Sequence, residues 1–216
     1  MGTHTLIGRR LARITVGYDA PDGVACELAG RGILMTHVAR FCCFAVAVLS
    51  LTLCAPGAMA DGLVSELKLG ALAHDPPNLW ARFQEEQSAV DANVEMLFHP
   101  LGVVLGGELR PAIGATLNTR GETSKGYVDL RWQAPIGSMA FIALGMGAAV
   151  HTGELTPVPG RKALGSRVLF HPSVEIGVNL DAHNNLSVFF DHMSNWNTQQ
   201  YNEGMDTLGL RYGHRF

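Results

Sequence analysis

The chain has 216 residues, of which 47% are hydrophobic and 16% are charged, and its formal net charge is −3 at pH 7. This slightly acidic balance argues against a nucleic-acid partner, because no basic stripe is available to neutralise phosphates. All four cysteines precede Asp61, so the remainder of the chain can form neither a disulfide nor a thiol-ligated metal site.

Residues 35–60 have the three parts of a secretory signal peptide. Arg40 supplies the basic region, and the apolar run over 41–54 is shorter than the ~20 residues that a membrane-spanning helix needs. The small residues of Ala58-Met59-Ala60 form a cleavage site. We therefore expect export and cleavage near Ala60.

Residues 1–34 precede this complete signal, which begins with its own methionine, and we interpret them as an over-called leader. Residues 61–216 are long enough for one domain. No metal-ligand spacing is visible in them, so we expect neither a metal nor a cofactor. Interface or turn roles are expected for six histidines: His74, His99, His151, His171, His183 and His214.

After Asp61, apolar and polar residues alternate with a period of two, which is the pattern of β-strands. The alternation is clearest in one segment, which begins at Val168 and ends at Leu180. The segments predicted as strands lie at about 63–73, 90–98, 108–117, 127–133, 138–150, 167–181, 186–194 and 206–216.

Eight strands of roughly ten residues are typical of an outer-membrane β-barrel, since strands of soluble proteins average about five or six residues. The polar faces carry charges that can pair inside a small barrel: Glu95, Glu108, Arg110, Asp129, Arg131, Glu175, Arg211 and Arg215. We predict an all-β fold, an eight-stranded antiparallel transmembrane β-barrel. A soluble periplasmic β-sandwich or lipocalin-like binder is disfavoured, because the same charges would line its core.

The lengths of the connections predict the orientation of the barrel. Bacterial barrels have short periplasmic turns and longer external loops. The connections at 74–88, 151–165 and 195–205 are longer than those at 99–106, 134–137 and 181–184, and the short connection at 118–123 is the exception. Both termini should therefore lie on the periplasmic side, and the long loops should face outward.

Three polar residues at the external end have the chemistry of a serine hydrolase. His192 and Ser194 lie two apart in one strand and so point to the same face, and Asp206 opens the next strand. This set could supply a nucleophile, a base and a carboxylate that orients the base. His192 continues the lipid-facing row of Leu186 and Val188, which fits a lipid substrate.

The runs His192-Met193-Ser194-Asn195 and Asn202-Glu203-Gly204-Met205-Asp206 resemble the motifs of the lipid A 3-O-deacylase (PagL-type) family, outer-membrane acyloxyacyl hydrolases. The resemblance implies an eight-stranded barrel with Ser194 as nucleophile, His192 as base, Asp206 as the acidic member and Asn195 as oxyanion support. One difference is that the family pattern has Glu where this chain has Asp206, which is one methylene shorter.

Other side chains are expected to border this site or to meet the substrate. Trp196 follows the motif directly. Four basic residues fall on predicted external loops, where they could bind lipid A phosphates or remain as solvated loop charge: Arg120, Lys125, Arg161 and Lys162. Aromatic girdles at the membrane interfaces are expected to contain Trp80, Trp132, Tyr212 and Phe216.

The sequence thus favours an outer-membrane lipid A deacylase that hydrolyses an ester-linked acyl chain of lipopolysaccharide. The alternative is a non-catalytic small outer-membrane barrel with a structural or lipid-binding role. The expected partners are lipid A in the outer leaflet and the membrane itself. A homodimer is compatible with the sequence, which does not decide the oligomeric state.

Overall fold

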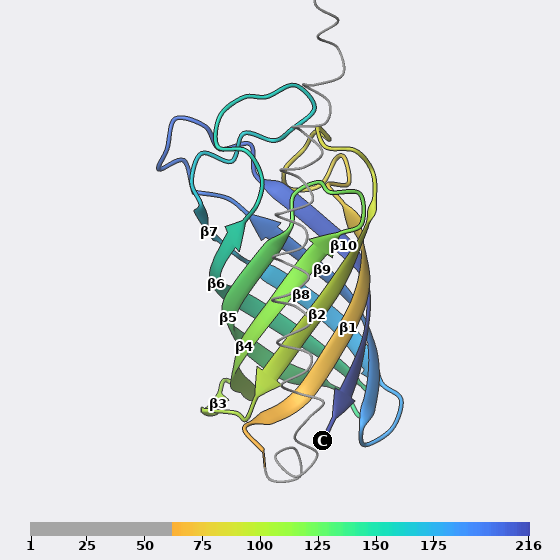
Figure 1. Ribbon diagram of the computed structural model, residues 1–216. Helices are drawn as coiled ribbons and strands as arrows, with labels where there is room; N and C mark the ends of the chain where they lie inside the picture. Colours follow the sequence, from red (N-terminus) through yellow and green to blue (C-terminus); the bar gives the residue numbers. More distant parts are fainter. Residues whose placement is uncertain (1–61) are drawn as a thin grey trace, which may run out of the picture. The chain divides into compact units, whose positions relative to one another are not determined.

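The computed structural model describes residues 62–216 (Figure 1), so the predictions for the leader and the signal peptide lie outside the described residues. The described part consists of strands and connections, and no helix in it is long and apolar enough to span a membrane. The strands are β1 (Val64–His74), β2 (Val90–Phe98), β3 (Gly102–Val104), β4 (Gly107–Asn118), β5 (Lys125–Ile136), β6 (Ala140–His151), β7 (Val168–Phe170), β8 (Ser173–Asn179), β9 (Asn184–Met193) and β10 (Met205–Arg215).

Eight of these strands close into an antiparallel ring. The pairs are β1–β2, β2–β4, β4–β5, β5–β6, β6–β8, β8–β9, β9–β10 and β10–β1. This closure confirms the predicted all-β, eight-stranded outer-membrane barrel. Closure also leaves no open sheet edge within the ring, as a bilayer requires.

Two short strands depart from the prediction. The expected strand 167–181 is divided into β7 and β8, because Pro172 has no N–H to donate to the ladder. β3 was expected to be a plain turn, but it pairs with the start of β4 and forms a hairpin at Leu105-Gly106.

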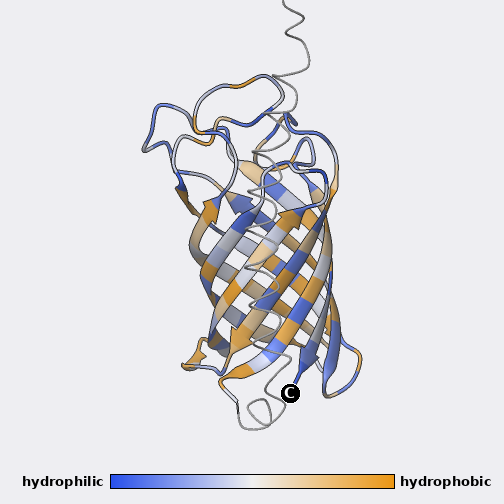
Figure 2. Cartoon of the chain, viewed as in Figure 1, coloured by the Kyte–Doolittle hydropathy of each residue, from blue (hydrophilic) through white to orange (hydrophobic). Residues whose placement is uncertain are grey.

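The barrel wall has an apolar outer face and a charged interior. Hydrophobic and hydrophilic residues alternate along its strands (Figure 2). Leu186, Val188 and Leu210 lie outside, with 43%, 50% and 57% of their surface exposed. Arg131 and Arg211, in contrast, are fully buried inside. This division is the reverse of a soluble protein and suits a wall surrounded by lipid.

Ion pairs fill the interior, as the sequence predicted. Lys68 Nζ lies 2.6 Å from Glu175 Oε1, and Arg211 Nη2 lies 2.6 Å from Glu95 Oε1. Arg131 also pairs with Glu95. One predicted interior charge differs, since Glu108 is exposed because it lies at the end of the wall, where the strand leaves the packed interior.

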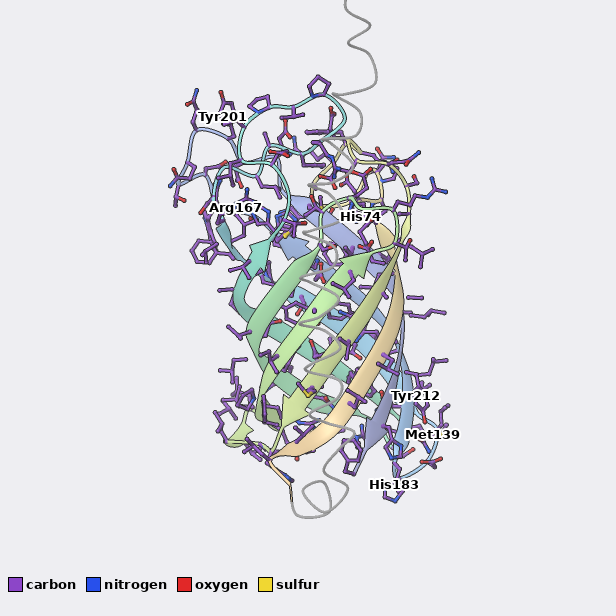
Figure 3. The ribbon with its side chains drawn as sticks, in the orientation of Figure 1. His74, Met139, Arg167, His183, Tyr201 and Tyr212 are labelled. Carbon is purple, nitrogen blue, oxygen red and sulfur yellow. The ribbon has the colours of Figure 1, made fainter. Side chains whose placement is uncertain are left out.

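Four connections, three of them long, gather at one end of the barrel, which we call the loop end: 75–89, 119–124, 152–167 and 194–204. Figure 3 labels His74, Arg167 and Tyr201 at this end, and Met139 and His183 at the opposite end, which we call the turn end. The C-terminus lies at the turn end (Figure 1).

Apolar residues close the mouth of the barrel at the loop end. Leu164, from the connection 152–167, packs in a buried cluster with Leu169, Met193 and Met205. Below this cluster, the buried Lys125 pairs with Asp191.

Two histidines that were expected at interfaces or turns are part of the buried network instead. His74 Nδ1 lies 2.9 Å from Asp91 Oδ2, and His171 Nδ1 lies 3.0 Å from Asp129 Oδ2. Each imidazole can donate to a buried carboxylate, and this pairing offsets the cost of removing the polar rings from water.

Candidate active site

His192 and Asp206 face each other across two neighbouring strands at the loop end. They are directly opposite in the β9–β10 register. His192 Nδ1 donates a hydrogen bond of 2.6 Å to Asp206 Oδ1, and both residues are almost completely buried. The direct opposition explains how an aspartate reaches the imidazole although it is one methylene shorter than glutamate.

The connection 75–89 covers this pair from outside. The indole of Trp80 stacks on the His192 ring, with centroids 4.5 Å apart and planes 9° from parallel. The backbone N–H of Ala81 donates to Asp206 Oδ2 over 2.7 Å. His192 therefore keeps its place on the lipid-facing row, yet only 4% of its surface is exposed.

Ser194 lies one step beyond the end of β9. Its backbone forms an isolated bridge with Phe170, which extends the pairing of the two chain segments past the strand. The half-buried side chain lines the same pocket as His192. Among the hydrogen bonds of residues 62–216, none joins the Ser194 hydroxyl to the imidazole, and such catalytic contacts often form only in the substrate complex.

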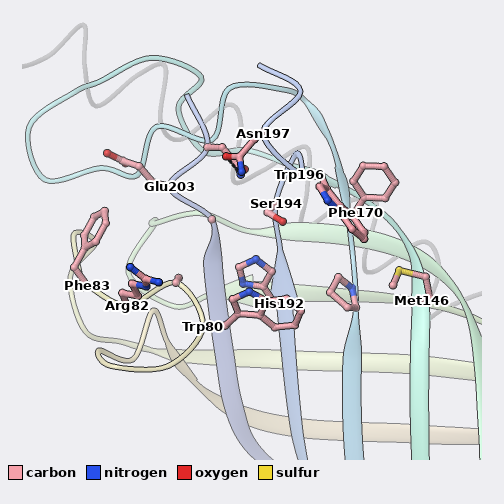
Figure 4. Close-up of a pocket in the computed structure, with 14 residues that line it drawn as sticks. Trp80, Arg82, Phe83, Met146, Phe170, His192, Ser194, Trp196, Asn197 and Glu203 are labelled. Carbon is pink, nitrogen blue, oxygen red and sulfur yellow. Dashed lines mark hydrogen bonds between the residues drawn. The ribbon is translucent and has the colours of Figure 1, made fainter. Parts of the chain in front are cut away.

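The pocket has a volume of about 760 Å³ and opens beside the barrel wall (Figure 4). About half of its lining is apolar or aromatic, and the other half is polar and includes one arginine, one glutamate and two asparagines. The lining residues are Trp80, Ala81, Arg82, Phe83, Met146, Phe170, Pro172, His192, Ser194, Trp196, Asn197, Asn202, Glu203 and Gly204.

A sequence model of the lipid A 3-O-deacylase (PagL) family matches residues 108–215, which is half of the chain and includes the His192–Asp206 pair. The chain belongs to the lipid A 3-O-deacylase (PagL) family. The resemblance predicted from the two sequence motifs is thereby confirmed. No curated protein matches the chain.

Solved structures are similar to this chain. The crystal structure of the outer membrane enzyme PagL aligns with a TM-score of 0.54 at 18% identity, covering 70% of this chain and 100% of that one. The Yersinia pestis outer membrane protein Ail follows with a TM-score of 0.43, 11% identity and coverage of 71% and 99%. Neisserial surface protein A has a TM-score of 0.42, 10% identity and coverage of 70% and 95%.

In this PagL-family chain, Asn195 holds two loops together. Its side-chain Nδ2 donates to Leu164 O over 3.0 Å and to Tyr201 O over 2.6 Å. Its backbone N–H donates to Asn202 Oδ1 over 2.8 Å. The structure thus gathers His192, Ser194 and Asp206 at the pocket, whereas the Asn195 amide is directed to the connections behind it.

The four basic residues expected on external loops divide into two pairs. Arg120 is exposed, and Arg161 is half-exposed and pairs with Glu122 at 2.6 Å. Lys125 is the first residue of β5 and points into the barrel, so its predicted loop position is wrong. Lys162 is also buried, because its ammonium lies 3.2 Å from Asp75 Oδ1, and neither lysine can reach a phosphate in solution.

Trp196 borders the pocket. It is 68% exposed and contacts the edge of the Phe170 ring, with centroids 5.5 Å apart. Trp196 and Asn197 both have positive φ, at 55° and 58°, so the chain turns sharply directly after Ser194.

The pocket residues that the sequence did not indicate come from the connection 75–89 and from the barrel wall, where they are Met146, Phe170 and Pro172. Trp80 was expected in an aromatic girdle, but it covers His192. Arg82 and Phe83 line the pocket beside it. The one local signal in this connection is the run Trp80-Ala81-Arg82-Phe83, which places two large aromatic side chains beside a cation.

Glu86 fixes the connection 75–89 to its neighbours. Its buried carboxylate accepts hydrogen bonds from His74 Nε2 at 2.9 Å, Thr123 N at 2.9 Å and Thr123 Oγ1 at 2.7 Å. Burial raises the pKa of Glu86, but the hydrogen bonds from His74 and Thr123 outweigh this effect and leave the pKa below its ordinary value. The ionised carboxylate thus anchors the loop that carries Trp80 and Ala81.

Proposed function

We propose that the chain is an outer-membrane enzyme that hydrolyses an ester-linked acyl chain of lipid A by a Ser/His/Asp mechanism. Membership of the lipid A 3-O-deacylase family supports the substrate and favours the 3-O position. The observation that carries the proposal is the buried His192–Asp206 pair. His192 of this pair and Ser194 line one pocket on the lipid-facing side of the wall.

The tautomer of His192 suits a general base. Because Nδ1–H donates to Asp206, the lone pair of Nε2 is free to take a proton. In the first step, Ser194 Oγ attacks the ester carbonyl while its proton moves to His192 Nε2. The tetrahedral intermediate collapses, the bond to the lipid A oxygen breaks, and the imidazolium returns the proton to that oxygen.

Water completes the cycle. His192 removes a proton from a water molecule, and the resulting hydroxide attacks the acyl group on Ser194. The Ser194–acyl bond breaks, Ser194 Oγ regains the proton, and the fatty acid leaves. Asp206 stays ionised throughout and stabilises the imidazolium in both steps.

Backbone N–H groups after Ser194 are the proposed donors to the oxyanion, a contribution of roughly 10²–10³ in kcat for each donor. The N–H groups of Trp196 and Asn197 make no hydrogen bond to any described residue, and both residues line the pocket. The Asn195 N–H is already used by Asn202, so Asn195 acts as support by holding the loop in shape.

The walls of the pocket support a lipid substrate. Met146, Phe170 and Pro172 form its side toward the barrel wall, and all three belong to or follow strands whose outer face contacts lipid. An acyl chain entering from the outer leaflet can lie against them without exposing apolar surface to water. A soluble ester would gain no such contact.

Mass spectrometry of lipid A tests the proposal. Cells expressing the wild type should contain lipid A that lacks one acyl chain, and Ser194→Ala should abolish this change. Ser138→Ala, at the exposed turn between β5 and β6, is the matched control and should behave as the wild type. Identical lipid A in wild-type and vector-only cells would instead favour a non-catalytic barrel with a structural role.

A further inference from the structure

The hairpin over residues 99–107 is the most exposed apolar segment at the turn end. Leu101, Val103, Val104 and Leu105 are 73%, 70%, 46% and 91% exposed. No Asp, Glu, Lys or Arg occurs between His99 and Gly107. Figure 2 shows the hairpin as a hydrophobic projection at the base of the barrel. Such a projection is unfavourable in water.

The tip of the hairpin has an unusual residue for its backbone conformation. Leu105 has φ 49° and is followed by Gly106 with φ 77°. A tight hairpin turn with two positive φ values favours Asn, Asp or Gly at its first position, because a larger side chain is strained there. A leucine at this tip has a strained backbone and, in water, an unburied side chain.

The base of the hairpin is fixed to the barrel wall by an indole. Trp132 Nε1 donates to Val104 O over 2.7 Å. The ring lies against Gly107 so closely that a Cβ there would be 2.5 Å from the indole. Tryptophan is enriched at the boundary between hydrocarbon and headgroups, so Trp132 marks a membrane interface at the level of the hairpin.

The apolar surface continues from the wall into the hairpin. Ile113 on β4 and Leu130 on β5 are exposed on the lipid-facing side above Trp132, by 42% and 43%. Ile136 at the end of β5 and Met139 on the turn that follows are exposed by 49% and 64%. The hairpin therefore extends a lipid-contacting surface that the barrel already has.

We propose that residues 99–107 lie in the periplasmic leaflet of the outer membrane, as an apolar hairpin that inserts among phospholipids. The occupant of this surface is the phospholipid itself, because the segment is uncharged, continuous with the lipid-facing wall and bordered by an interfacial tryptophan. Insertion buries the Leu105 side chain and compensates for its backbone strain. The hairpin thus increases the apolar surface of the barrel that contacts lipid in the leaflet opposite the pocket.

Photo-crosslinking in phospholipid vesicles tests this location. The protein is reconstituted with a phosphatidylcholine that carries a diazirine in its acyl chain, irradiated, digested and analysed by mass spectrometry. Adducts are expected on residues 101–105, as on Ile113 and Leu130. The polar turn 181–183 is the aqueous control. Adducts on Ile113 and Leu130 with none on 101–105 would overturn the proposal, as would crosslinks of the hairpin to a second copy of the chain.

A substitution at Leu105 tests whether the tip of the hairpin lies in lipid or in water, because the two locations predict opposite changes in the urea midpoint. Asparagine adopts the left-handed backbone more readily than leucine, so Leu105→Asn should raise the urea midpoint in vesicles if the hairpin is in water. Our proposal predicts a lower midpoint, because placing the polar asparagine side chain in lipid instead of water costs free energy. Leu105→Met keeps an apolar side chain and should unfold as the wild type does.

Lipid A hydrolysis provides an independent readout for the same variants. Leu105 lies at the turn end, away from the pocket, so each variant that folds should retain wild-type deacylation. A midpoint for Leu105→Asn equal to or above that of the wild type would reject the inserted hairpin and would leave the proposed function untouched.

Discussion

The indole of Trp80 lies parallel to the imidazole of His192, with the ring centroids 4.5 Å apart. This stack ties an external connection to the last residues of β9. A stacked aromatic pair contributes about 0.5–1.5 kcal/mol beyond the area that it buries. Trp80→Ala should therefore lower kcat for release of fatty acid from lipid A by roughly tenfold, because the imidazole loses its cover and its fixed plane.

Trp80→Phe is the matched control for this stack. A phenyl ring keeps a flat partner for His192, so this variant should retain most of the activity. Equal rates for Trp80→Ala and the wild type would show that the indole has no part in positioning the base.

Asp206 can be tested by keeping its shape and removing its charge. Asp206→Asn should lower kcat by about 10⁴, because the amide no longer stabilises the imidazolium. Asp206→Glu keeps the negative charge, but the longer side chain must fit one more methylene beneath Ala81. Its kcat should therefore be higher than that of Asp206→Asn and at most equal to that of the wild type. Activity in Asp206→Asn with none in Asp206→Glu would contradict the role of the carboxylate.

Gly204 lies against the edge of the His192 ring. A Cβ at this position would be 2.8 Å from Cε1 of His192, and the glycine has φ 67°. Gly204→Ala should reduce deacylation by roughly tenfold or more, because the added methyl displaces the ring. Gly160 offers the matched control, since its φ is 72° and a Cβ there would have nothing within 4 Å. If Gly160→Ala lost as much activity as Gly204→Ala, backbone strain and not the contact with His192 would be the cause.

Glu86 should control the order of the connection that carries Trp80. Glu86→Gln replaces two good acceptors of the Thr123 hydrogen bonds by one acceptor and one donor. Trypsin should then cleave faster after the exposed Arg82, and kcat should fall while the melting temperature of the barrel stays close to that of the wild type. Glu85→Gln, one residue earlier and exposed, should change neither.

The same carboxylate predicts a pH dependence. The pKa of Glu86 is lowered in the folded loop, so ionisation stabilises the loop above the ordinary pKa of a glutamate, and this stabilisation is lost as the pH falls through the lowered pKa. Hydrogen exchange of the amides in 75–89 should therefore increase, after correction for intrinsic rates, toward acid. The increase should disappear in Glu86→Gln.

Glu95 tests the charged interior. It lies between Arg131 and Arg211, and removing one member of such a buried group leaves charges uncompensated at a cost of about 3–5 kcal/mol. Glu95→Gln should lower the free energy of unfolding in vesicles by about this amount. The exposed Glu108 is the control, since Glu108→Gln should change it by less than about 0.5 kcal/mol. Equal effects would mean that the interior ion pairs contribute no stability.

The sequence predicted the barrel because alternation is a local signal. Each wall strand has its own apolar and polar faces, and these are visible without knowledge of the neighbours. The alternation did not show the break at Pro172 or the short strand β3. The pairing of β3 with β4 depends on a register that the alternation does not specify.

The site was predictable only in part, for the same reason. His192 and Asp206 lie on two adjacent strands and Ser194 directly follows the first of them, so a motif and a register were enough to bring the three together. Trp80 and the Ala81 N–H come from a connection far away in the sequence, and only the folded chain places them over the pair. Lys125 and Lys162 were expected on external loops, as ligands of lipid A phosphates or as solvated charge. Both are instead paired with buried carboxylates that lie far away in the sequence.

The charged interior and the apolar cluster of Leu164, Leu169, Met193 and Met205 at its mouth also determine how a substrate can arrive. With the inside of the barrel filled, access to the pocket is sideways, by lateral diffusion in the plane of the leaflet. The quantity that saturates the enzyme would then be the mole fraction of lipid A in the membrane and not its bulk concentration. Diluting lipid A with phospholipid at constant total lipid should slow the reaction, while diluting the vesicles with buffer should not.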